Sequence, residues 1–120
     1  MIIKFKTIDD ELNEINFKSE CKLENNTYIF KDKSMENTTI YLKIYEDYIN
    51  IIRKGDTNMY LDLKLNEKLD GNYENKLGLK FNFHSFTREI NIKSNGFYAT
   101  YDLIIDDNII NTHKIWILFN

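Results

Sequence analysis

The sequence predicts an all-β protein, a single domain over residues 1–120 whose antiparallel strands form a meandering barrel. Apolar and polar residues alternate along most of the chain, as in residues 59–65 and 97–105. A β-strand directs successive side chains to opposite faces, so a period of two indicates half-buried strands rather than helices. Proline is absent, and turn-forming residues interrupt the pattern at short intervals, which is typical of successive hairpins.

The alternation places the strands in order along the chain. We expect them at residues 2–7, 14–23, 27–31, 38–45, 48–54, 57–66, 79–84, 87–93, 97–105 and 109–119. Near the start, Ile8, Leu12 and Ile15 also lie at helical spacing behind Thr7, which could cap a helix. A hairpin loop is favoured there, because strand alternation resumes directly at Ile15 and Phe17.

Turn residues predict how neighbouring strands pair. The dipeptide Asn95-Gly96 is typical of a two-residue turn with both residues at positive φ, which sets Ile92 opposite Ala99. A three-residue loop over residues 54–56 places its glycine in the left-handed conformation. That loop sets Ile51 opposite Met59 and Ile49 opposite Leu61.

The pairing at the last turn, residues 106–108, is left open, and a bulge is expected nearby. If that loop has three residues, His113 lies opposite Tyr101. Consecutive hairpins of this length suit about eight to ten strands curled into a barrel, with a β-sandwich as the alternative. Such a barrel either holds one small ligand or is filled by its own side chains. Bulky residues expected to point inward are Phe17, Leu61, Leu63, Phe81, Phe83 and Tyr101.

Composition narrows the classes of partner. The chain has 42% hydrophobic residues and a formal net charge of −3, so nucleic acid and anionic membranes, which attract basic surfaces, are unfavoured partners. The single cysteine, Cys21, excludes an intramolecular disulfide. No apolar run reaches membrane-spanning length and no signal-peptide core is seen, so we expect a soluble cytoplasmic protein.

No motif indicates catalysis, a metal or a cofactor. The two histidines, His84 and His113, lack the partners and spacing of a transition-metal site. The acidic segments lack the ligand spacing of a calcium loop, and no glycine-rich phosphate loop or nucleophile motif is present. We therefore expect no catalytic residue, no metal and no cofactor.

A set of residues, ordered along the last two-thirds of the chain, resembles the YwiB-like proteins, small bacterial proteins of unknown function. The set is Ile52-Arg53-Lys54-Gly55, Met59, Gly71, Tyr73, Gly78, Thr87, Tyr101-Asp102-Leu103, His113, Ile115, Ile117 and Phe119. The resemblance implies a calycin-like, lipocalin-resembling β-barrel and brings no established active site, cofactor or substrate. The chain departs from the family at residues 75–77, where Thr-Pro-Tyr is common, and at residues 106–107, where Asn-Gly is common.

Four residues are candidate ligand contacts at the barrel mouth: Arg53, Tyr73, Tyr101 and His113. Arg53 extends an apolar strand face, so it is either paired with a neighbouring carboxylate or anchors a ligand carboxylate or phosphate. The two tyrosines combine an apolar ring with a hydroxyl that either orients a ligand or is satisfied within the core. His113 is either a hydrogen-bonded, semi-buried side chain or joins Tyr101 and Arg53 around an anion.

A second candidate surface lies on the outside of the last two strands. Trp116 and Leu118 face away from the barrel interior, and Tyr98 and Ile104 lie on the outer side of the preceding strand. This face needs covering by a loop, a second copy or another protein, because exposed aromatic and aliphatic side chains of this kind mark interfaces.

The leading interpretation is a non-catalytic barrel that binds a small, partly apolar ligand at its mouth. The alternative is a filled barrel that acts through its outer surface or as a homodimer. An enzyme or a single-stranded nucleic-acid binder is less favoured, although a Tyr41-Lys43-Tyr45 row could stack bases.

Overall fold

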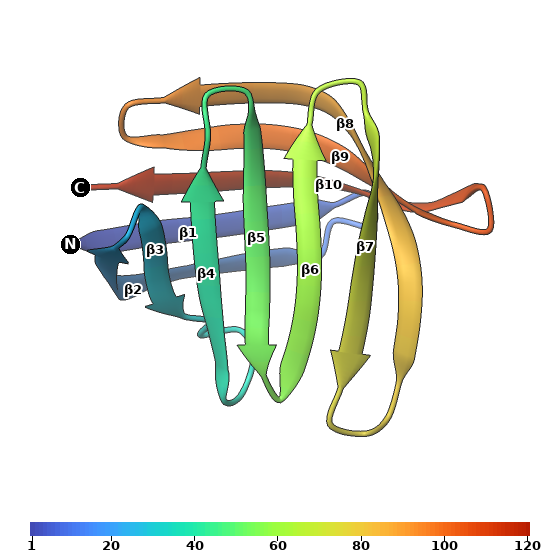
Figure 1. Ribbon diagram of the computed structural model, residues 1–120, viewed down its shortest axis with the longest axis horizontal. Coiled ribbons are helices and arrows are strands. Elements are labelled where there is room, and N and C mark those ends of the chain that lie inside the picture. Colours follow the sequence, from blue (N-terminus) through green and yellow to red (C-terminus); the bar gives the residue numbers. More distant parts are fainter.

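Ten antiparallel strands form a closed barrel in a computed structural model, which describes residues 1–120 (Figure 1). They are β1 (Ile2–Asp9), β2 (Glu14–Glu24), β3 (Thr27–Lys31), β4 (Thr38–Ile44), β5 (Tyr48–Gly55), β6 (Thr57–Lys64), β7 (Lys68–Asn75), β8 (Lys80–Lys93), β9 (Gly96–Ile105) and β10 (Asn108–Phe119). Each strand pairs with its neighbours in sequence, and β1 closes the sheet by pairing with β10. The predicted meandering barrel is confirmed, and the sandwich is excluded by that closure. The barrel has no helix that is long and apolar enough to cross a membrane.

Two strand predictions were wrong. The alternation predicts no strand at residues 68–75, where the structure has β7. This segment contains Asp70, Gly71 and Asn72, residue types that are depleted in strands. The glycine is required by packing, because a Cβ there would lie 2.4 Å from the ring of Phe83. The second error lies in β8, which runs unbroken from residue 80 to residue 93 although two strands were predicted. The hairpin loop favoured near residue 12 is confirmed.

The pairing predicted for the Asn95-Gly96 turn is shifted by two residues. Ile92 lies opposite Phe97, rather than opposite Ala99. Gly96 has a φ of +147°, and a Cβ there would lie 1.9 Å from a carbonyl oxygen of β10. The glycine therefore serves the close approach of β10, and it is the first residue of β9 rather than a central residue of the turn. A shift of two residues leaves the inward faces of both strands unchanged.

The loop between β5 and β6 differs in the same way. The last pair before the turn is Arg53 with Met59, which leaves a longer loop over residues 54–58 and sets Ile51 opposite Leu61. Gly55 has a positive φ, as predicted, of +134°. Here too the glycine allows close approach, since a Cβ would lie 1.9 Å from a carbonyl oxygen of the β3–β4 connection.

The last hairpin reaches the predicted pairing by a different geometry. Asp106 and Asp107 both have positive φ in a two-residue turn, and a bulge interrupts β10 between Ile109 and Asn111. The extra residue in the bulge has the same effect on register as a third loop residue. His113 therefore lies opposite Tyr101.

The interior of the barrel is occupied by side chains. A cluster of 16 buried hydrophobic residues fills it: Ile3, Phe5, Cys21, Phe30, Ile40, Leu42, Ile49, Ile51, Leu61, Leu63, Phe83, Phe97, Ala99, Tyr101, Ile115 and Ile117. Among the bulky residues predicted to point inward, Phe17 and Phe81 are only partly buried and pack against this cluster from one end of the barrel.

The two ends of the barrel differ. Because the strands alternate in direction, the connections β1–β2, β3–β4, β5–β6, β7–β8 and β9–β10 all lie at one end, which we call the mouth. They run along the lower and right-hand sides of Figure 1, opposite the two chain termini. At the other end Tyr28 stacks on Phe119 with 4.2 Å between ring centroids, which covers the core there.

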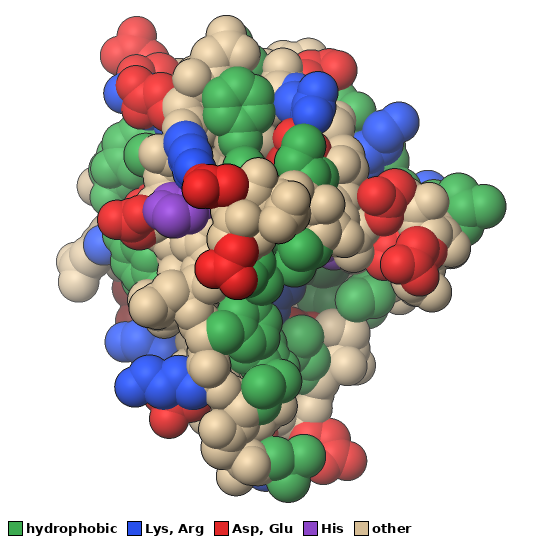
Figure 2. Space-filling model, turned by 90° about the vertical axis from the view of Figure 1, so that its right-hand side faces the viewer, with side chains coloured by type: hydrophobic (Ala, Val, Ile, Leu, Met, Phe, Trp, Pro, Cys, Tyr) green, Lys and Arg blue, Asp and Glu red, His purple; other side chains and the backbone are tan.

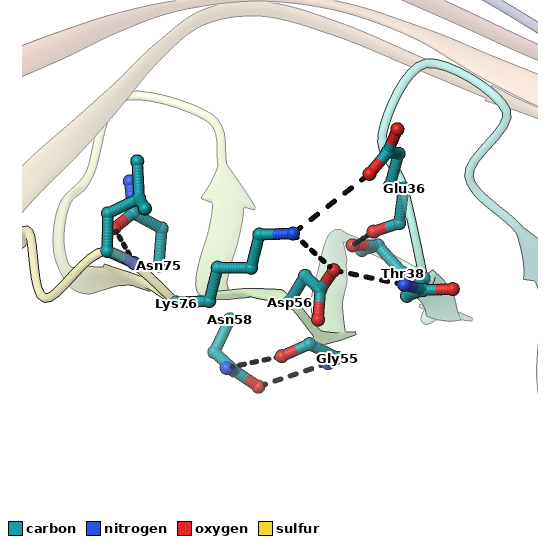
Figure 3. A network of polar contacts seen from close by, with 9 residues as sticks. Glu36, Thr38, Gly55, Asp56, Asn58, Asn75 and Lys76 are labelled. Carbon is teal, nitrogen blue, oxygen red and sulfur yellow. Dashed lines mark hydrogen bonds and ion pairs between the residues drawn. The ribbon is translucent and has the colours of Figure 1, made fainter.

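Polar contacts fix three of the mouth connections to one another (Figure 3). Asn37 Nδ2 donates a hydrogen bond to Asp56 Oδ2 at 3.1 Å, and Lys76 Nζ lies 3.2 Å from the same oxygen. These partners, the Asn37 amide first, hold the pKa of Asp56 below its usual range. Lys76 Nζ also lies 4.0 Å from Glu36 Oε2. The β3–β4, β5–β6 and β7–β8 connections thus form one braced rim.

Candidate functional site

Arg53 lies at the mouth and is held by a buried carboxylate. Its Nε donates a hydrogen bond to Asp32 Oδ2 at 2.9 Å, and the side chains of Arg53 and Asp32 are 12% and 0% exposed. The other carboxylate oxygen, Asp32 Oδ1, accepts a hydrogen bond from the backbone N–H of Ser34 at 2.9 Å. A buried charge is stable only when it is paired and hydrogen-bonded, and both conditions are met for Asp32.

The rest of the Arg53 guanidinium has few partners in the protein. Nη1 lies 3.7 Å from Met59 Sδ, a weak acceptor, and no protein oxygen accepts a hydrogen bond from Nη2. The guanidinium carbon lies 5.9 Å from the centroid of the Phe5 ring. A guanidinium carries five N–H donors, so Arg53 keeps donors that an oxygen of a bound molecule could use.

Tyr101 and His113 form a directly opposed pair on β9 and β10. Their ring centroids are 5.4 Å apart and their planes differ by 16°. Burial raises the pKa of Tyr101 to about 12, while the charge of Arg53 acts in the opposite direction. At neutral pH the phenol therefore keeps its proton and can donate a hydrogen bond.

Burial is the main reason why the neutral form of His113 is favoured. Burial lowers the pKa of His113, the carboxylates of Asp9 and Asp10 act to raise it, and Arg53 acts to lower it. Hydrogen bonds from Asn13 hold the pKa of Asp9 below its usual range, so that carboxylate is ionised. The charge of Arg53 acts to lower the pKa of both His113 and Tyr101.

Tyr73, the fourth predicted contact, lies farther from this group. It pairs with Met59 across β6 and β7, and its ring stacks on Phe81 with centroids 5.0 Å apart. Since Met59 also pairs with Arg53, one residue separates Tyr73 from Arg53 across the sheet. Tyr73 and Phe81 therefore form a wall of the mouth on β7 and β8.

Apolar side chains line and surround the mouth. Partly buried residues that pack against the core at this end include Phe17, Met59, Phe81, Leu103 and Ile105. Large hydrophobic side chains also stand exposed on the β1–β2 and β7–β8 connections and at the start of β10, namely Leu12, Leu77, Leu79, Ile109 and Ile110. In Figure 2 hydrophobic side chains gather around a hollow on the face that lies to the right in Figure 1.

Comparison with known proteins places the chain in a family. The model of a family described as "Domain of unknown function (DUF1934)" matches residues 2–117. The chain belongs to this family. No curated protein matches it. Among solved structures, the chain is similar to "Crystal structure of ywiB protein from Bacillus subtilis", with a TM-score of 0.68 and 12% identity over 99% of this chain and 90% of that chain. At this identity the likeness shows the fold, and the YwiB-like resemblance of the sequence is confirmed.

In this member of the family, the predicted outer interface residues fall into two places. Tyr98 and Trp116 are opposed on β9 and β10, with ring centroids 5.1 Å apart, and Leu118 lies two residues along β10 on the same face. Ile104 lies six residues from Tyr98 along β9, which is about 20 Å in a strand. The structure therefore gathers Tyr98, Trp116 and Leu118 and leaves Ile104 apart.

Sequence reasoning missed Asp32, although a signal was present. Tyr28, Phe30 and Asp32 follow the period of two along and just beyond β3, which places the carboxylate on the inner side. A partly buried Arg53 requires an anionic partner, and a lone carboxylate at an inward position is the natural candidate. The structure contains no group of three or more His, Cys, Asp or Glu side chains that could hold a metal ion.

Proposed function

We propose that the mouth of the barrel binds a small, partly apolar molecule without catalysis. The observation that carries this proposal is Arg53, a guanidinium that is only 12% exposed and still has N–H donors without a protein oxygen. These donors are not fully buried, so water reaches them in the free protein, and an oxygen of a bound molecule can replace that water. A ligand oxygen that enters the mouth would complete the hydrogen bonding of Arg53.

The charges of the mouth favour an uncharged polar group on the ligand. The carboxylate of Asp32 already balances the charge of Arg53 at 2.9 Å. The carboxylates of Asp9 and Asp10 lie close enough to His113 to act on its pKa. A ligand carboxylate would meet these three carboxylates, whereas a carbonyl or amide oxygen accepts the same hydrogen bonds without that repulsion. Tyr101 and neutral His113 can each donate or accept a hydrogen bond beside it.

The remainder of the ligand would contact apolar side chains. Met59, Phe81 and the ring of Tyr73 lie between Arg53 and the β7–β8 connection, so they form a continuous apolar path from the polar group outward. Because the core of the barrel is filled, the ligand would lie within the mouth rather than in a deep central cavity.

The first experiment is native mass spectrometry of the protein purified gently from its own host. The proposal predicts mass above that of the 14.4 kDa chain, and loss of this extra mass on denaturation. The variant Arg53→Met with Asp32→Leu removes the donors without leaving a buried charge, and it should lose the ligand. Trp116→Ala, on the outer face, should retain it. A bare chain mass for the parent protein, or equal retention by the double variant, would contradict binding at the mouth.

A second experiment tests the charge of the ligand. Octanamide and octanoate have the same apolar chain and differ in the charge of the polar end, so calorimetric titration of both isolates that charge. Octanamide should bind more tightly at pH 8, and the Arg53→Met/Asp32→Leu variant should lose most of the heat. Tighter binding of octanoate would refute the uncharged ligand and leave the site in place. Absence of heat with both probes would count against a site for short apolar chains.

A further inference from the structure

The outer face of β1, β2 and β10 carries a groove that is separate from the mouth. Its lining includes Lys4, Lys6, Asn16, Trp116 and Leu118, and its volume is about 260 Å³. We call this the Trp116 groove. A neighbouring hollow of about 230 Å³ shares Lys4 and Leu118 and continues to Asn95 and Asn120. Together the two hollows follow the chain from residue 116 to residue 120, about 13 Å, which is the length of some four extended residues.

Lysines lie in the groove and on the strands beside it, and most of them lack an acidic partner. Lys4, Lys18, Lys93 and Lys114 have no carboxylate within 4.0 Å, whereas Lys6 lies 3.4 Å from Glu14. Lys4 and Lys18 are directly opposed across β1 and β2. Like charges opposite one another destabilise a sheet, and an approaching anion would relieve this repulsion.

The register places these charges in a row with the apolar floor of the groove. Lys18, Lys4 and Leu118 are successive neighbours across β2, β1 and β10. The row continues through β9 to Lys93 on β8. Leu118 is 42% exposed between these lysines. An apolar strip flanked by unpaired cations is complementary to an acidic segment that carries an apolar side chain.

We propose that the Trp116 groove docks an acidic, extended segment of another protein, with an apolar side chain of that segment on Leu118. The closed barrel offers no free strand edge, so the segment cannot add to the sheet and must be held through its side chains. This site is independent of the ligand proposed for the mouth.

Two other occupants fit the groove less well. A second copy related by a two-fold axis would set this row of lysines against itself, which like-charge repulsion disfavours. Single-stranded nucleic acid requires an open aromatic face, but Lys6 Nζ lies 5.2 Å from the Trp116 ring centroid and Tyr98 lies against the same ring at 5.1 Å. Both occupants are outcomes of the test below.

Trp116 is the only tryptophan of the chain, so its fluorescence reports on the groove. The probe is an acetylated peptide of five residues in which three glutamates alternate with a leucine and a phenylalanine. We expect a saturable fluorescence change with a Kd on the order of 100 µM, because so small a contact gives weak binding. Raising NaCl from about 0.05 M to about 0.5 M should weaken this binding about tenfold.

A matched pair of variants locates the binding. Lys4→Gln with Lys18→Gln should weaken the peptide about fivefold and leave the fold intact, because it removes a repulsive pair. Lys33→Gln with Lys80→Gln removes the same charge from exposed positions outside the groove and should bind like the parent protein. Equal weakening by both pairs would overturn the proposal.

Three further results would also overturn it. One is equal binding of the peptide in which lysine replaces glutamate. Another is tighter binding of a ten-nucleotide oligothymidine than of the acidic peptide. The third is a concentration-dependent change in Trp116 fluorescence of the protein alone, accompanied by a dimer mass, which would assign the groove to a second copy.

Discussion

Replacing Arg53 by methionine tests how the mouth is held together. Methionine keeps most of the apolar volume of Arg53 but leaves the carboxylate of Asp32, which is fully buried, without a cation. Loss of one partner from a buried ion pair costs about 3–5 kcal/mol. The backbone N–H of Ser34 still donates to Asp32, and the partial exposure of Arg53 admits some water, so we expect the lower end, about 3 kcal/mol.

Urea unfolding followed by circular dichroism measures this cost. With a slope of about 1.5 kcal/mol per molar urea for a chain of this size, a loss of about 3 kcal/mol lowers the midpoint by about 2 M. The double variant Arg53→Met/Asp32→Leu removes both charges together. It should unfold within about 1 kcal/mol of the parent protein, because apolar residues of similar volume replace buried ion pairs at little cost.

Arg88→Met provides the matched control. Arg88 Nε lies 2.8 Å from the buried carboxylate of Asp102, but its side chain is 54% exposed, so water can replace the lost cation. Thr112 Oγ1 also donates to that carboxylate at 2.8 Å. We expect a cost of about 1 kcal/mol. A cost below about 1 kcal/mol for Arg53→Met, or additive costs in the double variant, would refute the assignment of Arg53 and Asp32 as a coupled buried pair.

Three further predictions concern ionisation and backbone geometry. Tyr101 has a pKa near 10 in the unfolded chain and about 12 in the folded protein, so stability should fall by up to about 2.7 kcal/mol between pH 10 and 12. Tyr101→Phe should flatten this part of a plot of urea midpoint against pH. An unchanged slope would contradict the burial of the Tyr101 hydroxyl. His113 has a folded pKa below its unfolded value of 6.5, so the unfolded chain takes up the proton first and stability should fall as pH drops below 6.5. His113→Phe should reduce this dependence; an unchanged dependence would argue against burial of His113 as its cause. Gly96→Ala should lower the free energy of unfolding by about 3 kcal/mol or more, because the added Cβ would lie 1.9 Å from a carbonyl oxygen. Gly78→Ala should cost about 1–2 kcal/mol, because Gly78 has a positive φ but open space around it. Similar losses in the two variants would contradict the close approach at Gly96.

The period of two was sufficient to predict the fold, because inward and outward faces are a local property of each strand. The same period could not fix register, since a shift of two residues preserves both faces. At residues 95–96 and at Gly55, the glycine was read as a turn residue, whereas a carbonyl oxygen of another connection or strand lies where its Cβ would be. Contacts between segments distant in sequence decided these two turns, and no local signal reports them.

The candidate site was predictable only in its parts. The sequence indicated Arg53, Tyr101 and His113 individually as candidate ligand contacts. It also predicted that Tyr101 lies opposite His113 for one of the possible lengths of the last loop, and the pairing of β9 with β10 has this register. Asp32 was missed because it follows β3 by one residue and comes to Arg53 from a strand that is not its neighbour in the sheet. Closure of the barrel, which brings β1 beside β10, sets Asp9 opposite His113.

The pair of Asp32 and Arg53 either stabilises the barrel or serves to bind a ligand, and a variant of both residues distinguishes these roles. If apolar residues can replace both charges with little loss of stability, the pair is not needed to hold the barrel closed. What the pair uniquely supplies is a guanidinium fixed through its Nε, with Nη2 left without a protein oxygen. A double variant that folds normally but no longer binds the molecule would therefore show that the pair serves ligand recognition. One that folds normally and keeps the molecule would contradict recognition by Arg53 and, with it, the proposed binding at the mouth.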